Sequence, residues 1–180
     1  IFTGRRAKDE QTSEYLSSTD NWFRPAQVKT GPDGTLWVVD MHRAVIEHPR
    51  WISEERLREL DVRAGSGAGR IYRVLAPGPR AQKIPNLASL SPIEIVRHLD
   101  TSNGTLRDLI QRELIFRDDS SVILALKKLG RESRSATTRL YAFSIIDVIA
   151  PEAVRELLVL ALQDRSPHVR RHAMRIAERF

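Results

Sequence analysis

The chain has 180 residues, 41% of them hydrophobic and 29% charged, which excludes a disordered or fibrous protein and is typical of one globular domain or two small ones. It has no cysteine, which excludes disulfides, thiolate metal sites and covalent haem attachment within these residues, and it has no apolar run long enough to span a membrane. The formal net charge of +6 is modest and the acids are interspersed, which argues against nucleic acid as a partner and favours an arginine-rich solvated surface.

The first part of the chain predicts short β-strands. Runs at 25–30 and 35–40 are joined by Gly31-Pro32-Asp33-Gly34, in which Pro32 sets the second turn position and Gly34 relieves the exit. A short helix is expected within 49–60 and a third strand at 70–74.

The second of these strands has apolar residues on both faces. Leu36 and Val38 face one side, and Trp37 and Val39 face the other, which predicts a strand covered on both sides. Three short strands do not make a stable fold alone, so residues 1–75 are expected to be one blade, with its loops, of a larger all-β body.

The glycine-rich segment Gly65–Gly69 (GSGAG) does not predict a nucleotide site. The dinucleotide fingerprint is G-x-G-x-x-G at the start of a helix, whose free N–H groups bind the pyrophosphate. Here the spacing is G-x-G-x-G and a strand follows, so a loop is expected.

The Pro-rich segment 76–90 is expected to be a linker, and after it the apolar period becomes helical. Ser91-Pro92-Ile93-Glu94 has the sequence of a capping box with proline at the first helical position. Apolar stripes spaced by three and four residues predict six helices. Their expected ranges are 91–99, 104–116, 120–129, 134–149, 151–163 and 167–180.

These helices repeat. An arginine recurs at steps of 32 residues (107 to 139) and 31 residues (139 to 170), and three apolar residues share one phase, namely Ile110, Ala142 and Ala173. A helix pair cannot bury its apolar face alone, so residues 91–180 are expected to be a stacked array of about three pairs, with that apolar phase buried. Arg107, Arg139 and Arg170 either bond turn carbonyls or an acid such as Asp164, or form a basic stripe for an anionic partner.

Two segments resemble known families. The segment Leu162–Glu178 (LQDRSPHVRRHAMRIAE) resembles a HEAT repeat, with Asp164 and Pro167 in the turn and then Val169, Arg170 and Ala173 on the second helix. The order NWFRP, GPDGTLWVVDMHR, IEHP and GRIYRV is similar to the closing blade of a six-bladed propeller of the soluble glucose/sorbosone dehydrogenase type. A blade that runs into HEAT-like repeats resembles a multidomain family of membrane-bound dehydrogenases, or haem-binding proteins, of planctomycetes and verrucomicrobia.

The resemblance covers about residues 15–180 and implies a periplasmic or otherwise extracytoplasmic parent protein, with membrane association left open. It implies a quinone resembling pyrroloquinoline quinone (PQQ) and a c-type haem on a downstream cytochrome-like module, and no cofactor within these residues. The implied partners are the other propeller blades, that downstream module and a small carbohydrate substrate. Because the first residue is Ile1 and not Met, the chain is expected to be a piece of something longer.

A tight hairpin at GPDG would pair Gly31 with Gly34 and so place Pro25 opposite Asp40 and Phe23 opposite His42. DNWFRP and DMHR would then meet at its open end. The expected cluster there is Asn21, Trp22, Arg24, Asp40, His42 and Arg43.

In propellers of the family that the chain resembles, loops on that side form the mouth of the active-site funnel. The resemblance implies catalytic roles for His42, Arg24 and Asp40, with His42 accepting a proton and Arg24 pairing an anionic cofactor or substrate oxygen. It implies ligand contacts for Asn21, Trp22 and Arg43. The alternative is an Arg24–Asp40 ion pair that locks the entry loop.

Other candidates have simpler explanations. His168 and His172 are four residues apart on one helix face, but Val169 stands where the zinc-protease pattern has Glu, and the neighbouring arginines would repel a cation, so no metal site is expected. Asn103-Gly104-Thr105 is a formal glycosylation sequon, which a turn between two helices also explains.

Two classes of function therefore stay open. The first is a fragment of an extracytoplasmic dehydrogenase-like protein, mixed β then α, in which a propeller blade precedes a helical scaffold and which is too incomplete to catalyse by itself. The second is a non-enzymatic HEAT-repeat module that binds a protein or a nucleic acid.

Overall fold

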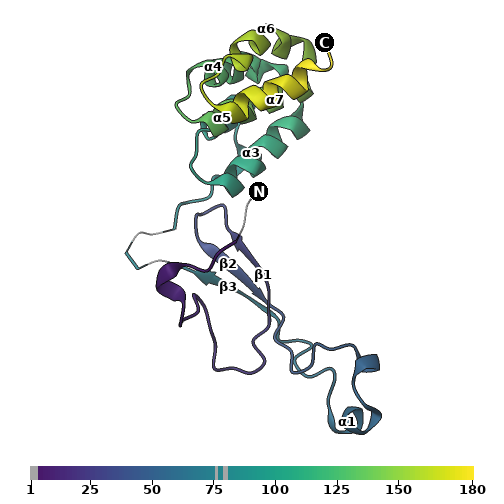
Figure 1. Cartoon of the computed structure of the whole chain (residues 1–180). Helices are drawn as coiled ribbons and strands as arrows, with labels where there is room; N and C mark the ends of the chain where they lie inside the picture. The colour runs from purple at the N-terminus through teal and green to yellow at the C-terminus, as the bar shows by residue number, and fades with distance from the viewer. Residues whose placement is uncertain (1–3, 76, 79–80) are drawn as a thin grey trace. The chain divides into compact units, whose positions relative to one another are not determined.

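The computed structural model describes residues 4–75, 77–78 and 81–180 (Figure 1). The chain divides into two compact units: unit 1 comprises residues up to 29 together with 36–74, and unit 2 comprises 30–35 together with 75–180. The expected linker at 76–90 lies partly outside the described residues, at 76, 79 and 80. No helix in the described part of the chain is both long and apolar enough to cross a membrane.

Three antiparallel strands form the sheet, in the order β1 (Pro25–Thr30), β2 (Leu36–Asp40) and β3 (Arg70–Val74). Strand β2 pairs with β3 from Leu36 opposite Val74 to Asp40 opposite Arg70. The three expected strands are confirmed, with β2 beginning one residue later than predicted.

The turn between β1 and β2 forms as expected, with one correction. The Gly34 N–H donates to the Gly31 carbonyl (3.0 Å), and Gly34 takes the left-handed conformation (φ +81°) that glycine permits. However, the Gly31 N–H donates to the carbonyl of Thr35 (2.7 Å) and not to that of Gly34, because the left-handed Gly34 forms a bulge with its neighbour.

Much of the apolar surface of the sheet is exposed, since no other described residues cover it. Val38 is fully buried, but every residue of β1 is exposed, and Ile71 in β3 is 62% exposed. The cover that the sequence predicted for both faces of β2 is thus not provided within this part of the chain: Val39 is 36% exposed.

The helix expected within 49–60 is divided in two. A 3₁₀-helix at Pro49–Trp51 is followed by α1 (Glu54–Glu59), because the Ser53 hydroxyl accepts from the Arg56 N–H and begins a new helix. The Gly65–Gly69 segment is a loop before β3, as predicted.

Unit 2 is helical, and each of the six expected ranges contains a helix. They are α2 (Pro92–Arg97), α3 (Gly104–Arg117), α4 (Ile123–Glu132), α5 (Ala136–Ile149), α6 (Pro151–Leu162) and α7 (Pro167–Ala177). The capping box at Ser91 is confirmed, since Glu94 Oε2 accepts from the Ser91 N–H (2.8 Å) and the Ser91 hydroxyl accepts from the Glu94 N–H.

The helices of unit 2 form two layers, with α3, α5 and α7 side by side and α4 and α6 behind them (Figure 1). The core lies between these layers, and Ile110, Ala142 and Ala173 are all buried in it, which confirms their predicted common phase. Helix α4 continues past the expected end at 129. A Cβ on Gly130 would lie 2.9 Å from the Phe143 ring, so this glycine permits close packing against α5 and does not end the helix.

The recurring arginines bond turn carbonyls. Arg107, Arg139 and Arg170 each donate to the carbonyl six residues earlier, which belongs to Thr101, Ser133 and Asp164 respectively. The Arg139 guanidinium also makes a two-pronged ion pair with the Asp164 carboxylate, both bonds being 2.7 Å, and its side chain is only 4% exposed. The first interpretation of the recurrence, a structural ladder, is therefore confirmed.

We predict that Asp164→Ala destabilises unit 2 by about 3 kcal/mol, because it leaves the guanidinium of Arg139 buried without its counter-charge. Thermal unfolding followed by circular dichroism at 222 nm measures the loss. Glu132→Ala is the control: it removes an exposed ion pair with Lys128 and should change stability by less than about 0.5 kcal/mol. Equal losses in the two variants would contradict the role given to Asp164.

Candidate functional site

The expected cluster at the open end of the hairpin forms in unit 1. The Arg43 N–H donates to the Trp22 carbonyl and the Met41 N–H to the Arg24 carbonyl, both at 3.0 Å, so the two segments are paired in the predicted register. This pairing places His42 opposite Phe23, although the bulge at the turn was not predicted. Gly31 is seven positions after Arg24, whereas Met41 is six positions after Thr35, so the β1 side contains one extra residue that restores the register.

The Asp40 carboxylate is the centre of the cluster. It is buried (1% exposed), and its Oδ1 accepts from the backbone N–H groups of Arg24 (2.8 Å) and His42 (2.9 Å). Burial alone would raise the pKa of Asp40, but these two hydrogen bonds and the nearby positive charge of His42 and Arg70 together lower the pKa below its ordinary value. Asp40 therefore carries a negative charge that ties the two segments together.

The imidazole of His42 lies between two carboxylates. Its Nδ1 is 3.6 Å from Asp20 Oδ2 and 3.8 Å from Asp40 Oδ2, and the ring of Trp22 lies against it with centroids 5.6 Å apart. Both His42 Nδ1 and Asp40 Oδ2 are buried without a hydrogen-bond partner in the described part of the chain. This arrangement favours a proton on Nδ1 and leaves Nε2 as the atom of His42 that can accept a proton.

Arg24 is placed differently from either expectation. Its backbone N–H, and not its guanidinium, bonds Asp40. The guanidinium Nη1 donates instead to the carbonyls of Asn21 (2.5 Å) and Phe23 (3.1 Å), so it stabilises the loop at 21–24. The predicted Arg24–Asp40 ion pair is replaced by Arg70, whose Nε lies 3.7 Å from Asp40 Oδ2.

Arg43 lines a cavity of about 410 Å³ next to this cluster. The cavity is lined by Met41, Arg43, Val45, Ile46, Val62, Arg63 and Ser66. Arg43 Nη1 donates to the Arg63 carbonyl (3.2 Å), and no acidic residue is among the lining residues. A carboxylate or another anionic group suits such a lining.

Close backbone packing holds the loop that contains His42. His42 has a left-handed backbone conformation (φ +49°), which is uncommon outside glycine, although histidine, asparagine and aspartate adopt it more often than other residues. Its carbonyl faces Gly65, where a Cβ would lie only 2.2 Å away, and Gly65 itself has φ +86°. The GSGAG loop thus supports the candidate site through the absence of a side chain at Gly65.

The sequence reasoning missed Asp20, Arg63, Gly65 and Arg70. Arg70 could have been found from the register of β2 and β3, since it lies directly opposite Asp40. No local signal marks Asp20, because its approach to His42 depends on how the loop at 20–23 folds back.

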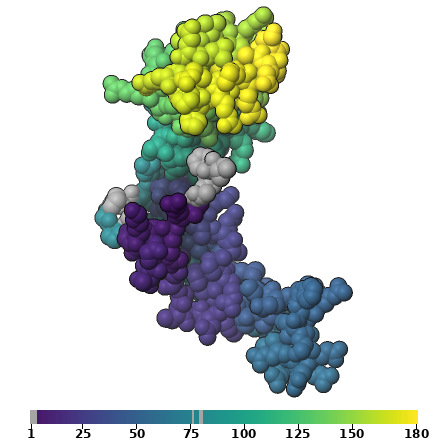
Figure 2. All heavy atoms as spheres, viewed as in Figure 1, coloured from purple at the N-terminus to yellow at the C-terminus, as the bar shows by residue number. Residues whose placement is uncertain are grey.

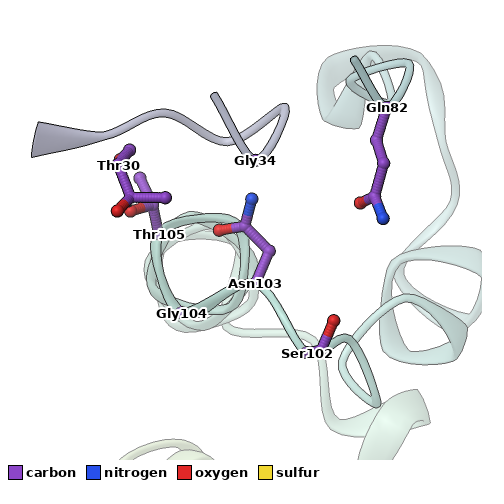
Figure 3. Close-up of a pocket in the computed structure, with 7 residues that line it drawn as sticks. All are labelled: Thr30, Gly34, Gln82, Ser102, Asn103, Gly104 and Thr105. Carbon is purple, nitrogen blue, oxygen red and sulfur yellow. The ribbon is translucent and has the colours of Figure 1, made fainter. Parts of the chain in front are cut away.

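In unit 2, the side chain of Asn103 lies between the start of α3 and the turn that includes Gly34 (Figure 3). Its Oδ1 accepts from the Leu106 N–H (3.1 Å) and caps α3, while its Nδ2 donates to the Gly31 carbonyl (2.9 Å). The Thr105 hydroxyl donates to the carbonyl of Thr30 (2.7 Å). A glycan would be attached at Nδ2, the atom that here donates to Gly31. The sequon residues thus serve as a helix cap and a turn contact, in line with the explanation of Asn-Gly by a turn.

Comparison with known proteins gives one match. Residues 1–77 match the family model described as Domain of unknown function (DUF7133). No curated protein and no solved structure matches the chain.

We predict that Gly65→Ala destabilises unit 1 by at least about 1–2 kcal/mol, because alanine disfavours a left-handed conformation and its Cβ would collide with the His42 carbonyl. All three tryptophans of the chain (Trp22, Trp37 and Trp51) lie in unit 1, so tryptophan fluorescence during urea unfolding reports on this unit. The control is Gly67→Ala, whose Cβ would meet nothing within 4 Å. A Gly65→Ala chain as stable as Gly67→Ala would refute the packing argument.

We predict an acid-sensitive stability that depends on Asp40. Because its pKa is lower folded than unfolded, its contribution is complete above the unfolded pKa and is lost as the pH falls through the folded pKa. Urea midpoints from tryptophan fluorescence between pH 7 and pH 2 should therefore fall less steeply in Asp40→Asn, which should also be less stable at pH 7. The exposed Asp9→Asn should follow the wild-type pH profile, and a parallel profile for Asp40→Asn would contradict the assignment.

Proposed function

We propose that residues 1–75 are the closing blade of a β-propeller in a dehydrogenase-like parent protein and that residues 91–180 are a HEAT-like helical scaffold attached to it. The observation that carries the proposal is the unburied apolar surface of the sheet: β1 is exposed throughout, and Ile71 and Val28 are 62% and 55% exposed. Such a surface in a three-stranded sheet is what neighbouring blades would cover.

The chemistry proposed for the blade lies at Asp40 and His42. In the oxidation of a sugar or alcohol, a base takes the proton of the hydroxyl group, and the hydrogen on the same carbon leaves as a hydride that carries the two electrons to an acceptor. His42 is the base in this proposal: two carboxylates face its Nδ1, and Nε2 is left to accept the proton. Asp40 positions His42 through the backbone bond at 2.9 Å and supplies the counter-charge.

The proposed acceptor is a quinone resembling PQQ, an anionic molecule. In this chain Arg43 and Arg63, on the acid-free cavity of about 410 Å³, are the residues that would hold one of its carboxylates. Arg24 is not assigned this role, since its guanidinium is bonded to backbone carbonyls. A c-type haem on a downstream module, and an extracytoplasmic location, remain part of the proposal by resemblance alone.

The helical scaffold is proposed from the same periodicity that buries Ile110, Ala142 and Ala173. The Arg139–Asp164 pair joins the first turn of α5 to the turn before α7 and so couples one helix pair to the next. This is how stacked repeats gain stability from their neighbours.

We predict that His42→Asn in the parent protein, assayed with added PQQ, an aldose and an artificial electron acceptor, lowers kcat about 100-fold or more. Asparagine tolerates the left-handed backbone of His42, so the urea midpoint should change little. The control is His98→Ala, an exposed histidine at the end of α2, which should leave kcat unchanged. Unchanged turnover in His42→Asn, or loss of stability without loss of turnover, would remove His42 from the proposed chemistry.

A further inference from the structure

Helix α7 has a basic stripe that the structural ladder does not use. From 165 to 177 the chain contains four arginines and two histidines and no acid. Val169, Ala173 and Ile176 form the buried face of α7. His168, Arg171, His172 and Arg175 follow the spacing i, i+3, i+4 and i+7, which places them on one other stripe of the helix. Helix α7, yellow in Figure 2, lies at the surface of the helical unit.

This basic stripe borders a cavity of about 250 Å³. Its lining residues are Leu140 of α5 together with His168, Arg171, His172 and Arg175, so that four of the five are basic and none is acidic. In the described part of the chain, neither Arg171 nor Arg175 forms a hydrogen bond or ion pair with another side chain, and both are exposed.

The other arginine-rich cavity of unit 2 differs in this respect. The cavity of about 380 Å³ around Arg139 contains four arginines, but also Glu132 and Asp164. The charge of Arg139 there is paired with that of Asp164. Positive charge is thus compensated within the chain at Arg139 and uncompensated at the α7 cavity.

The hydrogen bonds of His172 determine which of its atoms is available. Its Nε2 lies 2.8 Å from the Ser144 Oγ, and the Ser144 hydroxyl donates to the Leu140 carbonyl (3.0 Å). Since the hydroxyl proton is used in that bond, Ser144 accepts from Nε2–H, and the Nδ1 of the neutral ring has a lone pair that can accept from an acidic hydroxyl group of a ligand. Burial, and then the nearby positive charge of Arg175, lower the pKa of His172 below its ordinary value.

Like charges four residues apart on a helix repel each other, as Arg171 and Arg175 do here. A bound anion would reverse this repulsion, and two guanidinium groups that border one concavity can each donate two parallel hydrogen bonds to a tetrahedral oxyanion. We propose that the cavity bordered by His168, Arg171, His172 and Arg175 is a binding site for a phosphoryl group, either free phosphate or the phosphate of a small phosphomonoester. This inference is independent of the dehydrogenase proposal, because it concerns unit 2 alone.

The test is a titration of the whole chain with inorganic phosphate and, in a second arm, with glycerol phosphate, at a constant ionic strength kept with chloride. Isothermal calorimetry gives the dissociation constant, and the proton resonances of the His172 ring report whether the ligand reaches this cavity. We expect saturable binding of at least one of the two ligands and a shift of the His172 resonances. Binding of both at similar strength would indicate that the phosphoryl group alone is recognised, and binding of glycerol phosphate alone would indicate a phosphomonoester.

Arg171→Gln and Arg175→Gln should each weaken binding at least tenfold. Arg171→Lys, which keeps the charge and loses the fork of the guanidinium, should give an intermediate loss. The matched control is Arg112→Gln, an exposed arginine on α3 that should change the dissociation constant less than twofold. Circular dichroism of each variant checks that the helices are retained.

The proposal is overturned if neither ligand gives saturable binding, or if Arg112→Gln weakens binding as much as Arg171→Gln. It is also overturned if duplex DNA binds with a steep salt dependence while the phosphate arms show nothing, since that result indicates a diffuse basic surface. A retained affinity in both Arg171→Gln and Arg175→Gln would place the ligand elsewhere.

Discussion

The buried carboxylate of Asp40 is the interaction on which the candidate site depends. A single oxygen, Oδ1, accepts from the N–H groups of Arg24 and His42, which belong to the two segments on either side of the hairpin. Because a buried carboxylate needs such donors, these bonds tie the two segments together at Asp40 and hold the backbone N–H of His42, whose φ is left-handed. The His42 ring lies close to the same carboxylate and to Asp20, so the group that holds the loop also faces the candidate base.

In unit 2 a buried charged group also ties segments together through hydrogen bonds, but there the buried charge is positive. There the buried charged group is the Arg139 guanidinium, and the groups that satisfy it are the Ser133 carbonyl and the Asp164 carboxylate. Arg107 and Arg170 repeat the carbonyl bond at six residues' distance but not the ion pair. Ser133 occupies the position equivalent to Asp164 one repeat earlier, 31 residues before it. Its side chain is a neutral hydroxyl, which donates to Asp100 and cannot form an ion pair. The recurring contact is therefore the bond from each arginine to a backbone carbonyl, and among the described residues of this series the ion pair with an acid occurs only at Arg139.

Local patterns predicted most of the elements, and the failures have identifiable causes. The strands, the capping box and the buried phase of Ile110 follow from periodicity and turn residues, which act over a few positions. The expected helix ended at 129, but α4 continues to Glu132, because the missing side chain of Gly130 accommodates Phe143 from another helix. The residues around His42 were predicted as a group from strand spacing, but their bonds were not. Whether Arg24 uses its guanidinium or its backbone N–H at Asp40 depends on the path of the loop, which has no sequence signature.

Arginine has two opposite roles on adjacent positions of α7, and the difference lies in the phase of the helix. Arg170 follows the buried Val169 and points back to the turn, where the Asp164 carbonyl takes its charge-assisted bond. Arg171 is one position later, about 100° around the helix axis, and so belongs to the stripe with His168 and Arg175, away from any turn carbonyl or acid that could accept from it. Composition alone does not distinguish these two kinds of arginine. Their positions around the helix axis do: Arg170 forms its hydrogen bonds within the fold, whereas the charges of Arg171 and Arg175 are still available to a ligand.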